Sequence, residues 1–502
     1  MKLAIYPRLK HQWKMYKLFI VCTIIFSVTF TCTKKADIIP LPVVATSLVV
    51  FKSADDVSIM LSRLYSLTKS GQLFGGRYYV YNDVRGEDFL NTTSNVATAY
   101  EVWRQKITAV SSEPSEMWAA AYNAINHING FIEALNKSPS YVDAATATKY
   151  SAEARFLRAL NYYALINTFA QQYIRDDAQN LGVVLRLSTQ FYGTDDYMHM
   201  RRSTVGDVYE QIIADLNYAE ENLPSLYPTS ALNNTKPHKN SVIALKTRVY
   251  LTMRKWSDVV REANKIVSPT APFKALTGVA NTLQTSVVSV FIPPYKSTES
   301  MFSFPMGEEN ESDLPGKNNA LASFYMPLIG NGDFALNPEG ILANAAFTST
   351  DARYINFVKR DFVGDQGRYR LTKFPTGPDH KDYIPVIRYA EVLLNLAEAK
   401  AKLAEDRIDA SALILLNAVR GRSTTVYADN KFTTGKDLVN AILTERRIEF
   451  LGEGFRSIDL QRNLLPLPAK ANVSLIETTA SAYIWPIPST EIALNKYMVQ
   501  NP

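Results

Sequence analysis

The sequence predicts a mainly α-helical fold, in which stacked helix pairs form a scaffold and an irregular, loop-rich lobe carries a few short strands. Three observations lead to this prediction. Residues 151–170 carry apolar side chains at alternating spacings of four and three, the period of one face of a helix. Residues 241–267 and 388–422 each contain two helical stretches with a short break between them. Between residues 268 and 385 the helical period is lost, and proline and glycine recur.

Four helices are expected in the first half of the chain, because each stretch has apolar residues on one side. Ser151 would cap the third of them, since a serine side chain at a helix start accepts a hydrogen bond from a free backbone N–H. Pro224 ends the fourth, because proline cannot continue a helix. The four helices are predicted over residues 56–68, 116–135, 151–170 and 204–224.

The helix pairs that follow are TPR-like, that is, similar to tetratricopeptide repeats. The first pair is expected to break near Arg254 and Lys255, and the second covers residues 388–403 and 410–422. Small and aromatic residues recur at positions typical of such repeats, although the spacing between copies is irregular. One pair cannot bury its apolar face alone, so we expect the pairs to stack into a scaffold.

The irregular stretch is expected to be the loop-rich lobe of one domain that spans residues 46–502. Short strands are predicted at residues 300–304 and 369–374. Irregular segments on a rigid scaffold often carry function, so the lobe is a place to look for a binding site. The expected parts of the domain are an N-terminal helical part (46–267), the lobe (268–385) and a C-terminal helical part (386–502).

Residues 1–31 predict a secretory signal, with Met15 as an alternative start. A charged beginning precedes an apolar run over residues 18–30, which is shorter than the about 20 residues that span a bilayer and fits the core of a signal peptide. Cys32 follows at once and is expected to be the lipidated first residue of a bacterial lipoprotein, with a tether over residues 32–45. The alternative is an ordinary cleaved signal with an incidental cysteine.

The composition argues against several classes of function. The net charge of +6, from 54 Lys and Arg against 48 Asp and Glu, is mild for 502 residues, and no basic run accompanies it, so no nucleic-acid partner is expected. Both cysteines, Cys22 and Cys32, lie near the N-terminus, which excludes a disulfide framework. The five histidines lack metal-ligand spacing, and no phosphate-binding loop occurs. We therefore expect no metal site and no cofactor.

A charged segment, TERRIEFLGEGFRSIDLQR, raises the question of catalysis. Glu445, Glu449 and Glu453 are four residues apart and would share one helix face. A glycosidase uses two carboxyls about 5–5.5 or 6.5–9.5 Å apart, usually from different elements across a cleft. The interleaved arginines would keep these carboxylates ionised, whereas a general acid needs a raised pKa.

We therefore interpret this segment as a structural framework and expect no catalytic residue in it. A helix is predicted to continue through about Leu451 and to break at the glycines of residues 452–454. Ion pairs would hold this turn of the chain together. The residues expected in this structural ion-pair network are Arg446, Glu449, Glu453 and Arg456.

Several segments, taken in their order along the chain, resemble the SusD/RagB family. They are SAEARFLRALNYYALINTFA, RYAEVLLNLAEAKAKL, LNAVRGR, LTERRIEFLGEGFRSIDLQR and the closing YIWPIPSTEIALNKYMVQNP. The resemblance implies a SusD-like α-α superhelix and a lipoprotein exposed on the surface of a Gram-negative outer membrane. It further implies a non-catalytic protein that captures oligosaccharides, or peptides in some members, and delivers them to a SusC-like TonB-dependent transporter. The alternatives are an α-helical glycoside hydrolase and an adaptor that binds only protein.

Sugars stack on aromatic rings and bond to neighbouring polar groups, so clusters of both are candidate ligand contacts. One cluster follows the glycines of GGRYYVYNDVRGED, a region from which the family often draws ligand contacts, and a second group lies in the lobe. For each aromatic residue, core packing is the alternative. The candidate ligand-binding residues are Arg77, Tyr78, Tyr79, Tyr81, Asn82, Asp83, Tyr295, Phe304, Phe324 and Tyr325.

Overall fold

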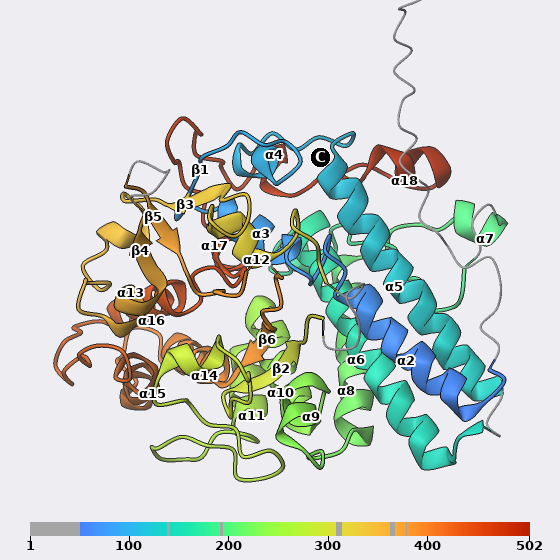
Figure 1. Cartoon of the computed structure of the whole chain (residues 1–502), viewed down its shortest axis with the longest axis horizontal. Helices are drawn as coiled ribbons and strands as arrows, with labels where there is room; N and C mark the ends of the chain where they lie inside the picture. Colours follow the sequence, from blue (N-terminus) through green and yellow to red (C-terminus); the bar gives the residue numbers. More distant parts are fainter. Residues whose placement is uncertain (1–50, 138–140, 191–193, 308–313, 362–366, 378) are drawn as a thin grey trace, which may run out of the picture. The chain divides into compact units, whose positions relative to one another are not determined.

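A row of long helices forms the scaffold of the chain (Figure 1). The structure, a computed structural model, describes residues 51–502 except 138–140, 191–193, 308–313, 362–366 and 378. The expected signal and the expected lipidation site at Cys32 lie outside the described residues. The long helices are α2 (Ala54–Thr68), α5 (Ser112–Lys137), α6 (Ala144–Phe169), α8 (Val205–Asn222), α10 (Lys239–Thr252), α11 (Trp256–Ala263), α14 (Tyr389–Leu403), α15 (Ala410–Arg420) and α16 (Gly435–Glu449).

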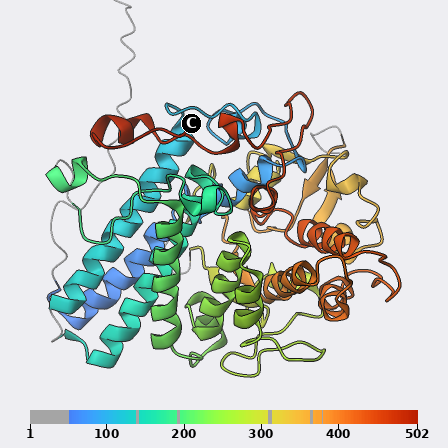
Figure 2. The ribbon, with the colours of Figure 1, turned by 180° about the vertical axis from the view of Figure 1, so that it is seen from behind.

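Each long helix packs against the next along this row, as the helix pairs predict. Helix α6 lies between α5 and α8, α10 follows α8, and α14 packs on both α10 and α11 before α15 and α16 complete the row. Figure 2 shows this succession from behind, from the cyan helices to the orange ones. Their facing sides are apolar, and the buried residues of all these helices belong to one continuous core.

The helix boundaries lie within about two residues of the predicted ones except at the starts of α5, which begins at Ser112 instead of residue 116, and of α6. Helix α6 begins at Ala144, where the Asp143 side chain accepts a hydrogen bond from the backbone N–H of Thr146. Ser151 therefore does not cap it and lies buried inside the helix. The regular spacing of apolar residues starts only at Ala152, about two turns into the helix, so it did not mark where the helix begins. The break after α10 is where it was expected, with Arg254 at a positive φ of 55°.

Short strands form two small antiparallel sheets. In the first, β1 (Phe89–Asn91) pairs with β3 (Phe334–Leu336), β3 with β5 (Tyr369–Leu371), and β5 with β4 (Val358–Arg360). In the second, β2 (Ser300–Phe304) pairs with β6 (Ile384–Arg388), which leads directly into α14. Both strands predicted in the lobe are present, although β5 ends at Leu371 instead of at residue 374.

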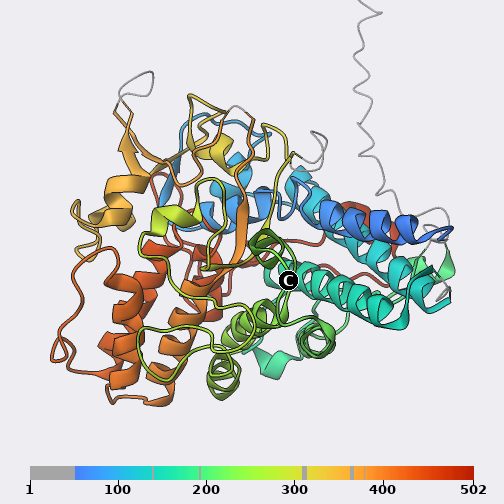
Figure 3. The same ribbon diagram turned by 60° about the horizontal axis from the view of Figure 1, so that its bottom comes forward.

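The loop-rich segment between residues 268 and 385 occupies two places in the fold. Its first part, before β2, runs beside α14 and α15 (Figure 3). Residues 267–273 of this part line a pocket together with these two helices. Its second part carries the sheet that β1 from the N-terminal part completes. Short helices fill the remaining turns: α3 (Arg77–Val84), α4 (Tyr100–Trp103), α7 (Asp195–Met198), α9 (Ser230–Thr235), α12 (Leu321–Tyr325), α13 (Ala352–Phe357), α17 (Arg456–Arg462) and α18 (Ser489–Leu494).

No helix in the described ranges is both long enough and apolar enough to span a bilayer.

Candidate functional site

The carboxylates of the charged segment lie in a buried network of ion pairs. Glu449 accepts hydrogen bonds from Arg353 at 3.0 Å, from Arg388 at 2.9 Å and from Arg422. Glu453 accepts from Lys373 and from Nε of Arg388, both at 2.8 Å. Burial acts to raise the pKa of Glu449, but the surrounding guanidinium groups outweigh it and hold this pKa well below its ordinary value. Glu449 is thus kept ionised, which does not suit a general acid.

The four residues expected to form the network all make ion pairs, but with partners from other elements and not with one another. Arg446 binds Asp459 at 3.1 Å, and Arg456 binds Glu87 at 2.6 Å. Helix α16 ends at Glu449, two residues earlier than predicted, because the chain then turns through Gly452 and Gly454 at positive φ angles of 83° and 76°. The segment therefore joins distant parts of the fold.

Among the described residues, no group of three or more His, Cys, Asp or Glu side chains is placed to hold a metal ion.

The candidate residues at positions 77–83 form helix α3, and the fold buries this helix completely. Tyr78 and Tyr79 pack on each other with ring centres 5.7 Å apart, and Tyr81 packs on Trp485. Asn82 accepts a hydrogen bond from the Ser457 hydroxyl. Asp83 accepts the backbone N–H of Gly454 at 2.9 Å. Burial raises the pKa of Asp83 to about 7, although the backbone N–H groups of Gly454 and Arg456 act to lower it.

The aromatic candidates of the lobe are also in the core. Phe304 packs between Phe74 and Phe302, Phe324 lies against Phe334, and Tyr325 stacks on Phe89 with ring centres 5.1 Å apart. Tyr295 stacks on Tyr383, which is half-buried, with ring centres 4.4 Å apart.

All ten candidate side chains are thus buried, and their role as direct ligand contacts stays a prediction that the packing disfavours. The sequence contained no clear signal of this outcome, because the segment mixes Arg77, Asn82 and Asp83 with its aromatic residues and is not apolar on all sides. The preceding glycines serve close packing: a Cβ on Gly76 would lie 1.8 Å from the backbone oxygen of Asn319.

Above α3, the Arg77 guanidinium supports a surface made of loops. Its Nε donates to the Asn319 side chain at 2.6 Å, one Nη donates to the backbone oxygen of Ala97 at 2.9 Å, and the other binds Glu116 at 3.0 Å. We call the surface that these loops form, residues 91–98, 316–319 and 331–333, the loop platform.

A second buried charge holds the loop platform from below. The Asp333 side chain is fully buried and accepts a hydrogen bond from the Thr93 hydroxyl. The backbone oxygen of Asp333 accepts from the backbone N–H of Thr92 at 2.8 Å. Burial raises the pKa of Asp333, and the bond from Thr93 opposes this shift. Two buried charged residues, Arg77 and Asp333, thus fix the geometry of the loops.

The exposed side of the loop platform presents hydroxyl and amide groups. Ser94 and Asn318 are exposed, and the Asn331 amide donates to Asn318 at 3.0 Å. Val96 adds an apolar contact and is 63% exposed. Fixed hydroxyls and amides beside an apolar group are suited to bind a ligand rich in hydroxyls. Sequence reasoning missed these residues, because NTTSN and KNN read as ordinary polar loops.

Comparisons with known proteins agree with this architecture. A sequence model described as "SusD family" matches residues 367–502, and one described as "Starch-binding associating with outer membrane" matches residues 52–251. Among curated proteins, SusD-like protein P38 of Formosa agariphila is 21% identical over 496 aligned positions, which cover 90% of this chain and 92% of that protein.

Solved structures extend the likeness over nearly the whole chain. A SusD superfamily protein from Bacteroides fragilis is 30% identical, with a TM-score of 0.78, and the match covers 90% of this chain and 100% of that one. A structure described as a SusD-like carbohydrate binding protein from Bacteroides vulgatus shares the fold at 20% identity and a TM-score of 0.73, covering 89% of this chain and 98% of that one. The chain therefore belongs to the SusD/RagB family.

Proposed function

We propose that the protein is a nutrient-binding lipoprotein of the outer membrane, anchored through Cys32 at the cell surface, which captures oligosaccharides and delivers them to a SusC-like TonB-dependent transporter. The observation that carries this proposal is the 30% identity to a SusD superfamily structure over 90% of the chain. The starch-binding description of the model that matches residues 52–251, and the carbohydrate-binding description of one structural relative, favour a glycan as the ligand.

The loop platform is the surface that suits glycan capture. Its exposed hydroxyl and amide groups match the hydrogen-bonding pattern of sugar hydroxyls, and Val96 offers an apolar contact for the C–H face of a sugar ring. Because Arg77 and Asp333 hold the loops from below, little conformational entropy is lost when a ligand binds.

Binding without chemical conversion is the second part of the proposal. Glycoside hydrolysis needs a carboxyl group that can give up a proton at neutral pH. The carboxylates that cluster in the sequence are instead bound by buried arginines and a lysine, as Glu449 is by Arg353 and Arg388 and Glu453 is by Lys373. This arrangement supports a structural role for them.

The test measures binding and turnover on the full chain with a panel of oligosaccharides, including maltooligosaccharides, and a panel of peptides. We expect saturable heat of binding with at least one glycan and no new reducing ends after prolonged incubation. The double variant Val96→Ser/Asn318→Ala should bind about tenfold more weakly, equivalent to about 1.4 kcal/mol, with unchanged melting.

The matched control is Val499→Ser/Asn356→Ala, which changes the same exposed residue types elsewhere and should leave affinity unchanged. Release of shortened glycans would refute the non-catalytic part. If the protein binds peptides and no oligosaccharide, the proposed ligand class is wrong and the protein is a peptide-binding member of the family. Equal affinities of the two double variants would remove the loop platform from the proposal.

A further inference from the structure

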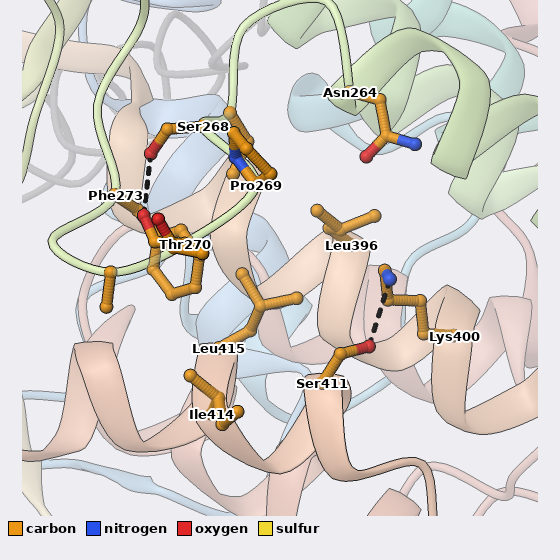
Figure 4. A pocket seen from close by; sticks show the side chains of 12 residues that line it. Asn264, Ser268, Pro269, Thr270, Phe273, Leu396, Lys400, Ser411, Ile414 and Leu415 are labelled. Carbon is orange, nitrogen blue, oxygen red and sulfur yellow. Dashed lines mark hydrogen bonds between the residues drawn. The ribbon is translucent and has the colours of Figure 1, made fainter.

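A pocket of about 590 Å³ lies away from the loop platform, between the loop that follows α11 and the helix pair α14–α15 (Figure 4). Its volume is in the range of sites for small organic molecules, about 300–1,000 Å³. The loop provides one wall, and successive turns of the two helices provide the other. The lining residues are Asn264, Val267, Ser268, Pro269, Thr270, Ala271, Phe273, Leu396, Lys400, Ser411, Ile414 and Leu415.

The walls of this pocket are mainly apolar, with six aliphatic residues and Phe273 among the twelve that line it. Figure 4 shows Leu396, Ile414 and Leu415 pointing toward the loop that carries Pro269 and Phe273. Ile414 is 50% exposed, so a branched apolar side chain at the pocket stays in contact with water. An apolar ligand that covered it would gain the free energy of removing this surface from water.

One cation stands at the end of this apolar wall. Lys400 is the single ionisable side chain among the twelve lining residues, all of which belong to the described part of the chain. Its ammonium donates to the Ser411 hydroxyl at 2.9 Å, and Ser411 in turn donates to Asp409, the residue that caps α15. An ammonium has three N–H donors, so Lys400 keeps donors for a ligand.

This chemistry differs from that of the loop platform. A glycan needs many hydrogen-bonding groups around each sugar. In this pocket seven of the twelve lining residues are apolar, and a single charged group and four neutral polar residues make up the rest. An apolar body with an anionic end matches both features, because the body fits the aliphatic wall and the anion pairs with Lys400.

We infer that this pocket is a second binding site, specific for an organic monocarboxylate with an apolar body. The body lies against Leu396, Ile414 and Phe273, and the carboxylate accepts hydrogen bonds from the Lys400 ammonium. The site is separate from glycan capture and does not depend on it.

Calorimetry on the full chain tests this with decanoate, and with decanol as the uncharged probe of the same length, both below their aggregation limits. Decanoate should bind saturably and more tightly than decanol. Lys400→Gln should weaken decanoate about tenfold and leave decanol unchanged, since only the charge pair is lost. Ile414→Trp, which fills the pocket from its exposed side, should weaken both probes about tenfold.

Lys359→Gln and Ile59→Trp are the matched controls, because both residues are exposed on other elements and should not alter either affinity. Melting curves show that each variant is folded. The inference is overturned if the unsubstituted chain does not bind decanoate, if Ile414→Trp binds it normally, or if Lys400→Gln weakens both probes equally. Loss of oligosaccharide binding in Ile414→Trp would also overturn it, because the pocket would then belong to the glycan site.

Discussion

At the scale of single residues, Glu449 shows how a buried charge depends on its neighbours. Three guanidinium groups surround its carboxylate, from Arg353, Arg388 and Arg422, and the side chain is fully buried. Such a group need not add much net stability compared with apolar residues of the same volume. Its removal, however, leaves buried cations without a counter-charge.

Glu449→Ala should therefore lower the free energy of unfolding by about 3–5 kcal/mol, measured by urea denaturation. Glu210→Ala, an exposed glutamate on α8, is the control and should change it by no more than about 0.5 kcal/mol. A Glu449→Ala protein with normal stability but without oligosaccharide binding would contradict the structural role and point to direct contact with the ligand.

Asp459 should make stability depend on pH in the acid range. Burial acts to raise its pKa, but Arg446 and Arg462 prevail and lower the pKa to about 2. An aspartate in an unfolded chain has a pKa of about 3.9, so at a pH between the two pKa values the folded state binds fewer protons than the unfolded state. The ionised Asp459 side chain therefore contributes about 2–3 kcal/mol to the free energy of unfolding. This contribution is complete above about pH 4 and is lost as the pH falls toward about 2.

The measurement compares the free energies of unfolding of the unsubstituted chain and of Asp459→Asn across this range. Their difference should shrink as the pH falls from about 4 to about 2, because protonation removes the same charge that the substitution removes. Two curves that stay parallel down to the lowest pH would contradict this account.

At the scale of elements, α3 departs furthest from what its sequence suggested. The segment was expected to offer ligand contacts after flexible glycines, whereas it is a buried helix packed against the turn before α17. Two glycines permit the close packing of α3, one against residue 319 and one against this turn. The Cβ position of Gly76 meets the backbone of Asn319, and that of Gly454 lies 2.7 Å from Cα of Tyr79.

Gly454→Ala should destabilise the protein by about 2 kcal/mol or more, because the residue has a positive φ of 76° and no room for a Cβ. Thermal melting measures the loss. Gly206→Ala is the matched control, since its Cβ would meet its nearest neighbour at an ordinary 3.5 Å, and this change should be neutral or slightly stabilising. Equal melting temperatures for the two variants would refute the packing argument.

At the scale of the whole molecule, the stacked helices form a rigid support and the loops carry the surfaces. The loop platform rests on α3 and on the small sheet, while the apolar pocket lies between the scaffold itself and the loop after α11. Two surfaces of different chemistry can therefore act on one support without sharing residues.

The proposed attachment to the membrane concerns the entire chain and would rest on Cys32. Cys32→Ser should move the protein from the membrane fraction to the soluble fraction, because the acyl chains that would hold it can no longer be added. Fractionation and incorporation of labelled palmitate measure this. If the variant still takes up palmitate and sediments with membranes, the lipoprotein prediction is wrong.

The sequence by itself determined the long helices, the break near Arg254 and the family. These are local features, because the period of apolar residues and the capping residues act within a few turns of the chain. It also predicted that Glu449 stays ionised, but it attributed this to the wrong arginines, because the guanidinium groups that pair with this carboxylate come from Arg353, Arg388 and Arg422.

Only the tertiary structure decided which partners these charges have and which surfaces reach solvent. Arg77 bonds to Asn319 from 242 residues away, and Arg456 bonds to Glu87 across 369 residues. No local pattern specifies such pairs, because they depend on how the helices stack and on where the loops return. The burial of α3, the exposed loop platform above it and the pocket beside α14 and α15 all follow from this long-range packing.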